Sequence, residues 1–376
     1  MFSNFMIKFL SALMSFVLSA GTFFGAYVPS STGEPEEYFD SNIKNVIYLI
    51  GDGMGFNHLE KTKDERDISL AMDTFEVKGS SRSRSINKKV TDSAAGGTAL
   101  AAGIRTSNSA VGVYHLDKKA KFFYPKNITE LCMERGMLTG VVTTDETSGA
   151  TPASFSAHSA DRDYADEITA DQLSSGINLI WGKANGVATA SAANAGGYEY
   201  ITTYSEMMAL EEGSYSFAQF TNSLWTLEQS DKNTPTLEQM AVKAVDLLDD
   251  TDEGFFLMIE GAHIDKHSHS NYSDEMTESL AEFDKTIEAM LEYAKNDGET
   301  LVIVTADHET GAIKLEGDSY NYTSGDHSAA NVPVLVYGTD KFISVGETVN
   351  NYEIPIRIAY TLGFDKNQFP IQVNVK

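Results

Sequence analysis

The stretch NVIYLIGDGMG, residues 45–55, joins a short apolar run to a turn in which glycines flank Asp52. Residues 45–50 are rich in Val and Ile and do not alternate with polar residues. This pattern is typical of a strand buried on both faces of a parallel sheet. Four further runs share the pattern, at residues 138–143, 255–259, 301–305 and 332–337.

Helical patterns lie between these runs. Residues 127–135 form one helix-length segment, which Gly136 ends, and two more have apolar residues at helical spacing. These two stripes are Leu237, Met240, Ala244, Val245 and Leu248, and Met276, Leu280, Phe283, Ile287 and Leu291 before Gly298. The alternation predicts an α/β fold with a doubly wound, mostly parallel sheet flanked by helices. We expect a single domain over residues 42–376, with an insertion at about 165–235 over one edge of the sheet.

Composition excludes several classes of function. The 376 residues carry a formal charge of −26, which disfavours nucleic-acid binding through a basic surface and docking on anionic lipid. The one cysteine, Cys132, excludes an intramolecular disulfide framework and a cysteine-based zinc finger. Such an acidic chain needs another source of positive charge if it handles anions.

The N-terminal segment predicts export. Lys8 precedes an apolar run at residues 9–18, and the small residues 19–21 follow. We expect a signal peptide at residues 1–26, or an uncleaved membrane anchor as the alternative, and a linker at 27–41. The expected location is periplasmic or extracellular, with membrane attachment only if the segment stays uncleaved.

Polar side chains cluster where the predicted strands end. In open α/β sheets, ligands bind beyond the carboxyl ends of the strands. The side chains in question are Asp52 after the first run, Thr151 after the second, Glu260, Asp265 and His269 after the third, Asp307 and His308 after the fourth, and His327 before the fifth.

These carboxylates and imidazoles predict a metal centre. Asp265 and His269 are four residues apart, so they lie on one side of a helical turn and can grip one ion. Several carboxylates at one sheet edge repel one another unless cations neutralise them. Carboxylates mixed with imidazoles suit Zn²⁺, and an all-oxygen subset suits Mg²⁺. Taken singly, Asp52 could mark a plain strand-to-helix turn, and Asp307 with His308 a surface or capping pair.

Ser93 lies where a helix is expected to begin. The segment 91–97 opens an Ala-rich helix that runs to about residue 102. Its first turn offers free N–H groups and the positive end of the helix dipole to an oxyanion or phosphate. Asp92 or Ser93 could simply cap this helix. Beside a metal site, Ser93 is also a candidate nucleophile, because coordination lowers the pKa of a hydroxyl.

Together these motifs resemble the bacterial alkaline phosphatases, in particular the short members from marine and cold-living bacteria. The matching blocks follow the family's order over most of residues 42–340. They are residues 51–55, 91–95, 150–153 with Arg162, 260–265 with His269, 305–308, and 325–328. The resemblance implies an alkaline-phosphatase-like fold and the hydrolysis of small phosphate monoesters.

The resemblance also implies a role for each residue. Ser93 would form a phosphoserine, and Arg162 would grip two phosphate oxygens in a fork. The implied metals are two Zn²⁺ and one Mg²⁺. The implied ligands are Asp265, His269 and His327 for the first zinc, Asp52, Asp307 and His308 with Ser93 for the second, and Asp52, Thr151 and Glu260 for magnesium.

The chain departs from the family pattern at Gly149. Relatives carry Asp or His there, near the magnesium, whereas glycine has no side chain to hold the metal's waters. This substitution leaves the affinity and identity of the third metal open. Lys266 matches a lysine that approaches the phosphate through water in some relatives, and a solvated surface lysine is the alternative. His263 and His267 fill no ligand position, so we expect them to be structural.

The leading hypothesis is a secreted, metal-dependent phosphomonoesterase that releases phosphate for scavenging. A phosphodiesterase or sulfatase on the same fold is an alternative, although residues 92–95 lack a sulfatase motif and diesterases usually place Thr as nucleophile. A non-catalytic zinc- or phosphate-binding periplasmic protein is a third hypothesis. Relatives are often dimers, and the sequence leaves pairing into a homodimer open.

Overall fold

The computed structural model describes residues 33–114, 123–221, 233–249, 251–370 and 372–374. The expected signal peptide or anchor at residues 1–26 lies outside the described residues. No helix within the described ranges is both long and apolar enough to cross a bilayer. Part of the expected linker is described and includes the one-turn helix α2 (Pro35–Tyr38), whose Tyr38 ring lies 6.1 Å from that of Tyr360.

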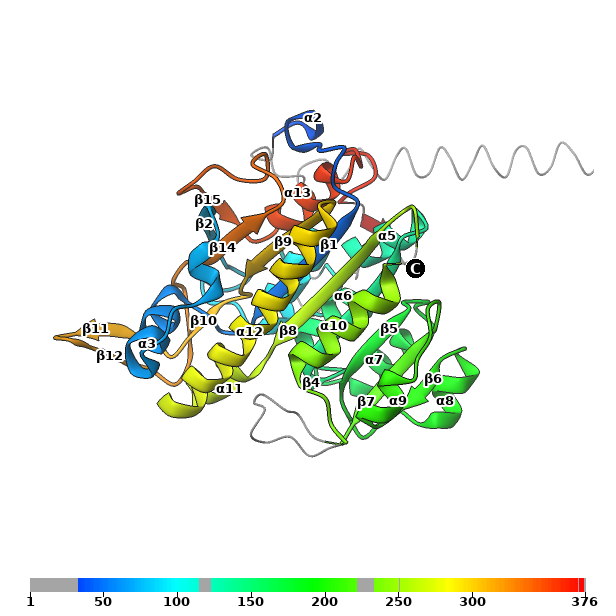
Figure 1. Cartoon of the computed structure of the whole chain (residues 1–376), viewed down its shortest axis with the longest axis horizontal. Helices are drawn as coiled ribbons and strands as arrows, with labels where there is room; N and C mark the ends of the chain where they lie inside the picture. The colour runs from blue at the N-terminus through cyan, green and yellow to red at the C-terminus, as the bar shows by residue number, and fades with distance from the viewer. Residues whose placement is uncertain (1–32, 115–122, 222–232, 250, 371, 375–376) are drawn as a thin grey trace, which may run out of the picture. The chain divides into compact units, whose positions relative to one another are not determined.

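A large sheet forms the centre of the compact unit Glu34–Lys376 (Figure 1). Its strands are β1 (Asn45–Gly51), β2 (Val77–Arg82), β4 (Leu138–Glu146), β5 (Leu179–Lys183), β6 (Glu199–Ile201), β7 (Ser216–Phe220), β8 (Phe255–Gly261), β9 (Thr300–Thr305), β14 (Val332–Tyr337) and β15 (Thr348–Asn350). Their order across the sheet is β15-β2-β14-β9-β1-β8-β4-β5-β7-β6. All five predicted strands are present, as β1, β4, β8, β9 and β14.

The remaining strands form small two-stranded pairs. They are β3 (Phe123–Pro125) with β16 (Gln372–Asn374), β10 (Glu309–Thr310) with β13 (His327–Ser328), and β11 (Lys314–Glu316) with β12 (Ser319–Asn321). The pair of β10 and β13 matters most for function, because it brings His327 beside the segment that follows β9.

The helices confirm the periodicity in the sequence. The stripes at 237–248 and 276–291 lie in α10 (Leu237–Leu248) and α12 (Ser273–Asp297), and Gly298 ends α12 in the left-handed conformation. The other helices are α3 (Phe56–Arg66), η1 (Ala71–Thr74, a 3₁₀ helix), α4 (Ser93–Ala102), α5 (Ile128–Glu134), α6 (Ala150–Ser156), α7 (Ala165–Gln172), α8 (Ala190–Ala195), α9 (Tyr204–Met208), α11 (His263–His269) and α13 (Glu353–Thr361).

Helices cover both faces of the sheet, which explains the unbroken apolar strands. Ile47 and Leu49 of β1 pack in one core with α10 and α12, which lie along the strands in Figure 1. Val46, Tyr48 and Ile50 face the opposite core, which α4, α5, α6 and α13 complete. Since successive strand residues point to opposite faces, a strand buried on both sides has few polar positions. The predicted doubly wound α/β class is confirmed.

One strand runs against the others. Among the described strands of the sheet, β14 is antiparallel to both of its neighbours, β9 and β2. Its first residue therefore lies at the edge where the parallel strands end. This direction brings His327, which precedes β14 in the chain, to the same edge as Asp52 and Asp307.

The segment at about 165–235 lies at one edge of the sheet. It contributes β5, β6 and β7, which pair in parallel and extend the sheet in its own plane beyond β4. These strands have three to five residues each and include polar side chains such as Gln219. Short strands of mixed composition lack the apolar run that predicted the central strands.

Candidate active site

The strand register places the ends of β1, β8 and β9, and the predicted site residues there, at the same edge of the sheet. Ile50 of β1 pairs with Glu260 of β8 on one side and with Thr305 of β9 on the other. Asp52, Glu260 and Asp307 therefore leave neighbouring strands at the same edge. Gly53 permits the sharp turn here, since its φ is +72° and a Cβ would lie 2.9 Å from Asp265.

A first cluster consists of Asp265, His269 and His327. Asp265 Oδ1 lies 3.4 Å from His269 Nε2 and 3.6 Å from His327 Nε2. The two Nε2 atoms are 3.0 Å apart. The carboxylate and His269 come from successive turns of α11, as their spacing predicted, and His327 comes from β13.

Backbone contacts fix the tautomer of both histidines in this cluster. His269 Nδ1 lies 2.6 Å from the carbonyl oxygen of Gly325, and His327 Nδ1 lies 3.0 Å from that of Thr91. A carbonyl oxygen only accepts, so each Nδ1 carries the proton. In the neutral rings, both Nε2 atoms then direct lone pairs at each other and at Asp265. A shared cation satisfies this arrangement, and the carbonyl contacts are the outer partners that metal-binding histidines usually have.

A second cluster surrounds His308. Its Nε2 lies 3.2 Å from Asp307 Oδ2 and 3.4 Å from Asp52 Oδ1. Its Nδ1 lies 3.2 Å from Thr310 Oγ1, and that hydroxyl donates its own proton to Asp265 Oδ1. The Thr310 hydroxyl therefore accepts from Nδ1–H, which leaves the lone pair of Nε2 pointing at the carboxylates.

Two carboxylate oxygens of the second cluster face inward without a proton donor. Asp307 Oδ1 accepts from the backbone N–H groups of Gly53 (3.2 Å) and His308 (2.9 Å), whereas its Oδ2 has no hydrogen-bond partner. Asp52 Oδ1 is likewise buried without one. Buried polar atoms normally have partners, so these oxygens fit a cation.

Ser93 borders the second cluster. It is the first residue of α4, is 4% exposed, and places its Oγ 3.1 Å from His308 Nε2. Asp92, not Ser93, caps the helix, because Asp92 Oδ1 accepts from the backbone N–H of Ala95 at 2.9 Å. The capping alternative is therefore resolved, and the Ser93 hydroxyl faces the inner edge of the site.

Arg162 lies on the open side of the site. Its Nη1 is 3.9 Å from Asp92 Oδ2, and that oxygen also accepts from the backbone N–H of Ser109 at 2.7 Å. The Arg162 side chain is 36% exposed, so its guanidinium can still bind an arriving anion. Asp92 therefore caps α4 and also contacts Arg162. The sequence had suggested only the capping role.

A third group consists of oxygen donors only. Thr151 Oγ1 and Glu260 Oε1 are buried without a hydrogen-bond partner. The other Glu260 oxygen, Oε2, accepts from the Thr143 hydroxyl. These donors and the nearby Asp52 fit a hard cation such as Mg²⁺. Thr143 was predicted only as a strand residue, and no sequence signal distinguishes it from other strand threonines.

The pKa values of the buried carboxylates show that the site lacks compensating positive charge. Burial, with repulsion from neighbouring carboxylates, raises the pKa of Asp52 well above its ordinary value. Burial and the charge of Asp265 raise the pKa of Asp307 to about 6, and burial and the charge of Asp145 raise that of Glu260 to about 8. Burial lowers the pKa of His308 well below its usual range, so the imidazole stays neutral and able to bind a metal.

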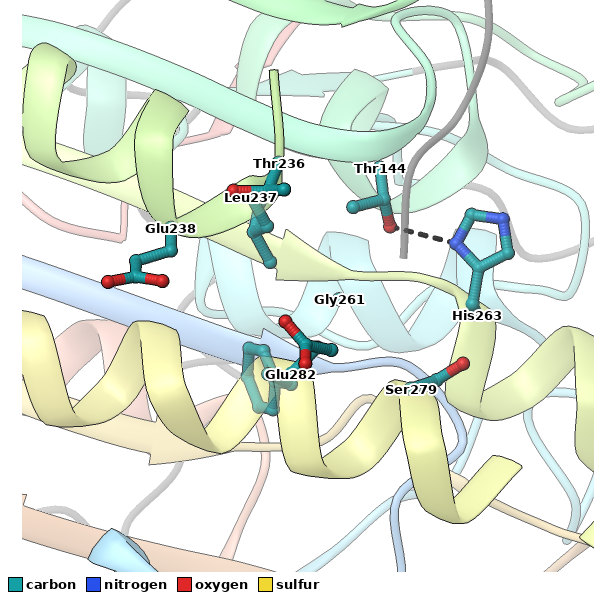
Figure 2. A pocket seen from close by; sticks show the side chains of 9 residues that line it. Thr144, Thr236, Leu237, Glu238, Gly261, His263, Ser279 and Glu282 are labelled. Atoms are coloured by element: carbon teal, nitrogen blue, oxygen red, sulfur yellow. Dashed lines mark hydrogen bonds between the residues drawn. The ribbon is translucent and has the colours of Figure 1, made fainter. Parts of the chain in front are cut away.

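His263 and His267 contact hydroxyl groups that belong to neither cluster. His263 Nδ1 lies 3.1 Å from Thr144 Oγ1, and His267 Nδ1 lies 3.0 Å from Ser279 Oγ. Figure 2 shows the contact between His263 and Thr144 in a pocket that is also lined by residues of α10, β8 and α12. The space open to the centre of a water molecule there is about 20 Å³, which is enough for about one water. No predicted metal ligand lines this pocket.

A family model described as alkaline phosphatase matches residues 43–183 and 181–353. Alkaline phosphatase 4 of Bacillus subtilis (strain 168) is 32% identical over 345 residues, which cover 84% of this chain and 72% of the relative. The Escherichia coli (strain K12) alkaline phosphatase is 30% identical, with 72% of this chain and 70% of that protein covered.

The chain belongs to the alkaline phosphatase family. It is therefore an enzyme of the phosphomonoesterase class. The structure of the alkaline phosphatase from the Antarctic bacterium TAB5 has a TM-score of 0.76 and 29% identity, and the match covers 86% of this chain and 99% of that one. A mutant of the TAB5 enzyme with Mg bound in its M3 site has a TM-score of 0.75 and 29% identity over the same shares.

Proposed function

We propose that this alkaline phosphatase is a secreted, metal-dependent phosphomonoesterase that works through a phosphoserine at Ser93. One observation carries the proposal. The Nε2 lone pairs of three histidines and the unpaired oxygens of buried carboxylates converge beside the Ser93 hydroxyl. Such an arrangement is stable when cations occupy it, and cations beside a hydroxyl make a nucleophile.

The ligand chemistry supports two zinc ions and one magnesium ion. Mixed nitrogen and oxygen donors suit Zn²⁺, whereas oxygen donors alone suit Mg²⁺. When bound, the zinc ions would supply Lewis-acid activation of the serine and water oxygens and stabilise the leaving oxygen. The residues that would hold them are Asp265, His269 and His327 for the first zinc, Asp52, Asp307 and His308 for the second, and Asp52, Thr151 and Glu260 for magnesium.

The chain's own residues perform the remaining steps. Ser93 Oγ attacks phosphorus, so that the serine O–P bond forms as the ester O–P bond breaks and the alcohol leaves. A water then cleaves the phosphoserine and restores the hydroxyl. The Arg162 guanidinium holds two phosphate oxygens in a fork, Asp92 orients it, and the N-terminus of α4 adds a favourable dipole.

Export and phosphate scavenging complete the proposal. Residues 1–26 have the weakly basic start, apolar middle and small-residue exit of a signal peptide. An exported phosphomonoesterase can release phosphate from esters that do not enter the cell. N-terminal sequencing of the protein from periplasmic and culture fractions tests this part, and an intact residue 1 in a membrane fraction would favour the anchor instead.

Substrate class can be tested with purified protein. A chromogenic phosphate monoester, a diester and a sulfate ester are assayed before and after chelation, and again after zinc and magnesium are restored. We expect turnover of the monoester, its loss on chelation, and its recovery with metals. Preferred turnover of the diester or the sulfate ester would contradict the proposal.

The phosphoserine can be tested separately. Acid quenching during turnover should leave one phosphoryl group on the peptide that contains Ser93. Ser93→Ala should lose the label and nearly all turnover while it keeps its zinc. A Ser93→Ala variant with the full rate would exclude the proposed intermediate.

A further inference from the structure

Asp145 fills the space that a side chain at position 149 would take. Gly149 is the N-cap of α6, with φ −53° and ψ 151°, a conformation open to any residue. A Cβ on Gly149 would lie 2.5 Å from Oδ2 of Asp145 and 2.9 Å from its Cγ. Since real Cβ atoms do not approach so closely, the glycine and this position of the carboxylate depend on each other.

Asp145 is also tied to the third group of ligands. Its backbone N–H donates to Thr143 Oγ1 at 2.8 Å, and the Thr143 hydroxyl donates to Glu260 Oε2. Asp145 Oδ1 forms an ion pair with Lys266 Nζ. The Asp145 side chain is 21% exposed, so most of it is shielded from solvent.

Two independent atoms indicate that a cation belongs beside Asp145. Thr151 Oγ1 and Glu260 Oε1 are buried without partners, in residues that are each 1% exposed. Leaving such groups without a hydrogen bond or an ion is costly. The donors there are oxygens, and a hard cation that keeps several waters needs outer oxygens to hold those waters.

We propose that Asp145 is the outer carboxylate of this chain's magnesium site and replaces the side chain missing at position 149. In this arrangement Asp145 Oδ2 holds water bound to the cation, while Oδ1 holds Lys266 at the rim of the site. An oxygen at this position favours Mg²⁺, whereas an imidazole would favour Zn²⁺. The inference rests on the proposed function for the ligands Asp52, Thr151 and Glu260. It addresses the affinity and identity of the third metal, which the sequence left open at Gly149.

The test is direct titration of magnesium into protein whose two zinc positions are filled. Isothermal calorimetry gives the affinity without reference to activity. Asp145→Ala should bind Mg²⁺ about 10- to 100-fold more weakly, the usual effect of removing an outer partner. Gly149→Ala should weaken binding similarly, because its Cβ displaces the carboxylate. Zinc content and the zinc-loaded melting temperature should stay as in the wild type.

A rescue variant separates this role from a general structural one. Asp145→Ala combined with Gly149→Asp removes one carboxylate and supplies another from the side that Asp145 occupied. We expect magnesium affinity within about threefold of the wild type, well inside the 10- to 100-fold loss of the single variant. Asp318→Ala, which removes an exposed acid in the turn between β11 and β12, is the matched control and should leave affinity unchanged.

Three results would overturn the inference. They are unchanged magnesium affinity in Asp145→Ala, failure of the rescue variant, and a wild type that hydrolyses monoesters yet binds no magnesium. The last result would indicate that the Lys266 ammonium serves as the third cation. If the wild type failed to hydrolyse monoesters, the proposed function would fall, and the titration would still report on Asp145.

Discussion

Replacing Glu260 by Gln should stabilise the metal-free protein at alkaline pH, although it removes a proposed metal ligand. Glu260 is 1% exposed, and its Oε1 has no partner. Burial and the charge of Asp145 raise its pKa from the ordinary 4.5 to about 8. Ionised Glu260 is therefore an unfavourable charge in the folded protein whenever no cation is bound. Gln keeps the shape of the side chain and removes the charge.

The direction in which stability changes with pH follows from proton binding. Between about pH 4.5 and about pH 8 the folded chain keeps a proton on Glu260 that the unfolded chain has released. Stability is then lost as pH rises, and the loss is complete above the folded-state pKa. Each pKa unit corresponds to 1.36 kcal/mol, so the loss from Glu260 reaches about 5 kcal/mol. Asp307, whose folded-state pKa is about 6, adds a smaller loss at lower pH.

Urea unfolding in chelator measures this effect. The free energy of unfolding of Glu260→Gln should exceed that of the wild type by less than about 1 kcal/mol near pH 5 and by up to about 5 kcal/mol near pH 9. Glu316→Gln, at an exposed position in β11, is the control and should match the wild type at both pH values. With zinc and magnesium restored, the order should reverse, because the variant has lost a ligand.

A pH-independent difference between Glu260→Gln and the wild type would refute this reasoning. It would mean that Glu260 has an ordinary pKa in the metal-free protein and does not face uncompensated carboxylates. A variant that was less stable than the wild type at both pH values would also contradict it. In that case the contact with Thr143 would matter more than the buried charge.

Three further predictions concern substrate binding. Arg162→Lys should lower kcat/KM for a monoester about 10-fold with zinc content unchanged, because a lysine cannot hold two phosphate oxygens in a fork. Asp92→Ala should cost about 1 kcal/mol of stability in urea unfolding and also lower kcat/KM; Asp92→Asn should keep the cap of α4 and lose only activity. Raising ionic strength should not lower kcat/KM for an anionic monoester, because salt screens the repulsion from a chain of charge −26; a steep fall would contradict this.

The central strands were predictable because each is buried on both faces. Their apolar runs distinguish them from helices by length and by enrichment in Val and Ile. Strands β5, β6 and β7 were not predicted, because their three to five residues include Gly182, Gln219 and charged ends that interrupt the apolar run, although β5 and β7 are almost fully buried. The antiparallel direction of β14 could not be predicted either. An apolar run such as residues 332–337 is compatible with a parallel or an antiparallel strand.

The positions of the proposed ligands at one edge of the sheet were predictable because a strand end fixes where a side chain arrives. Asp52, Glu260 and Asp307 needed only the strand boundaries, and His269 needed only helical spacing from Asp265. Thr310 and Asp145, which contact the proposed ligands or their neighbours, could not be predicted because their contacts are tertiary. Thr310 contacts Asp265 of α11 as well as its near neighbour His308, and Asp145 lies in the space that Gly149 leaves. No local pattern records such contacts.

The central claim is that cations fill the two clusters beside Ser93. Diffraction from zinc-loaded crystals, recorded on both sides of the zinc absorption edge, tests it most directly. We predict one anomalous peak among Asp265, His269 and His327, and a second among Asp52, Asp307 and His308, within reach of the Ser93 hydroxyl. Zinc-loaded crystals with no anomalous peak at these two positions would contradict the account.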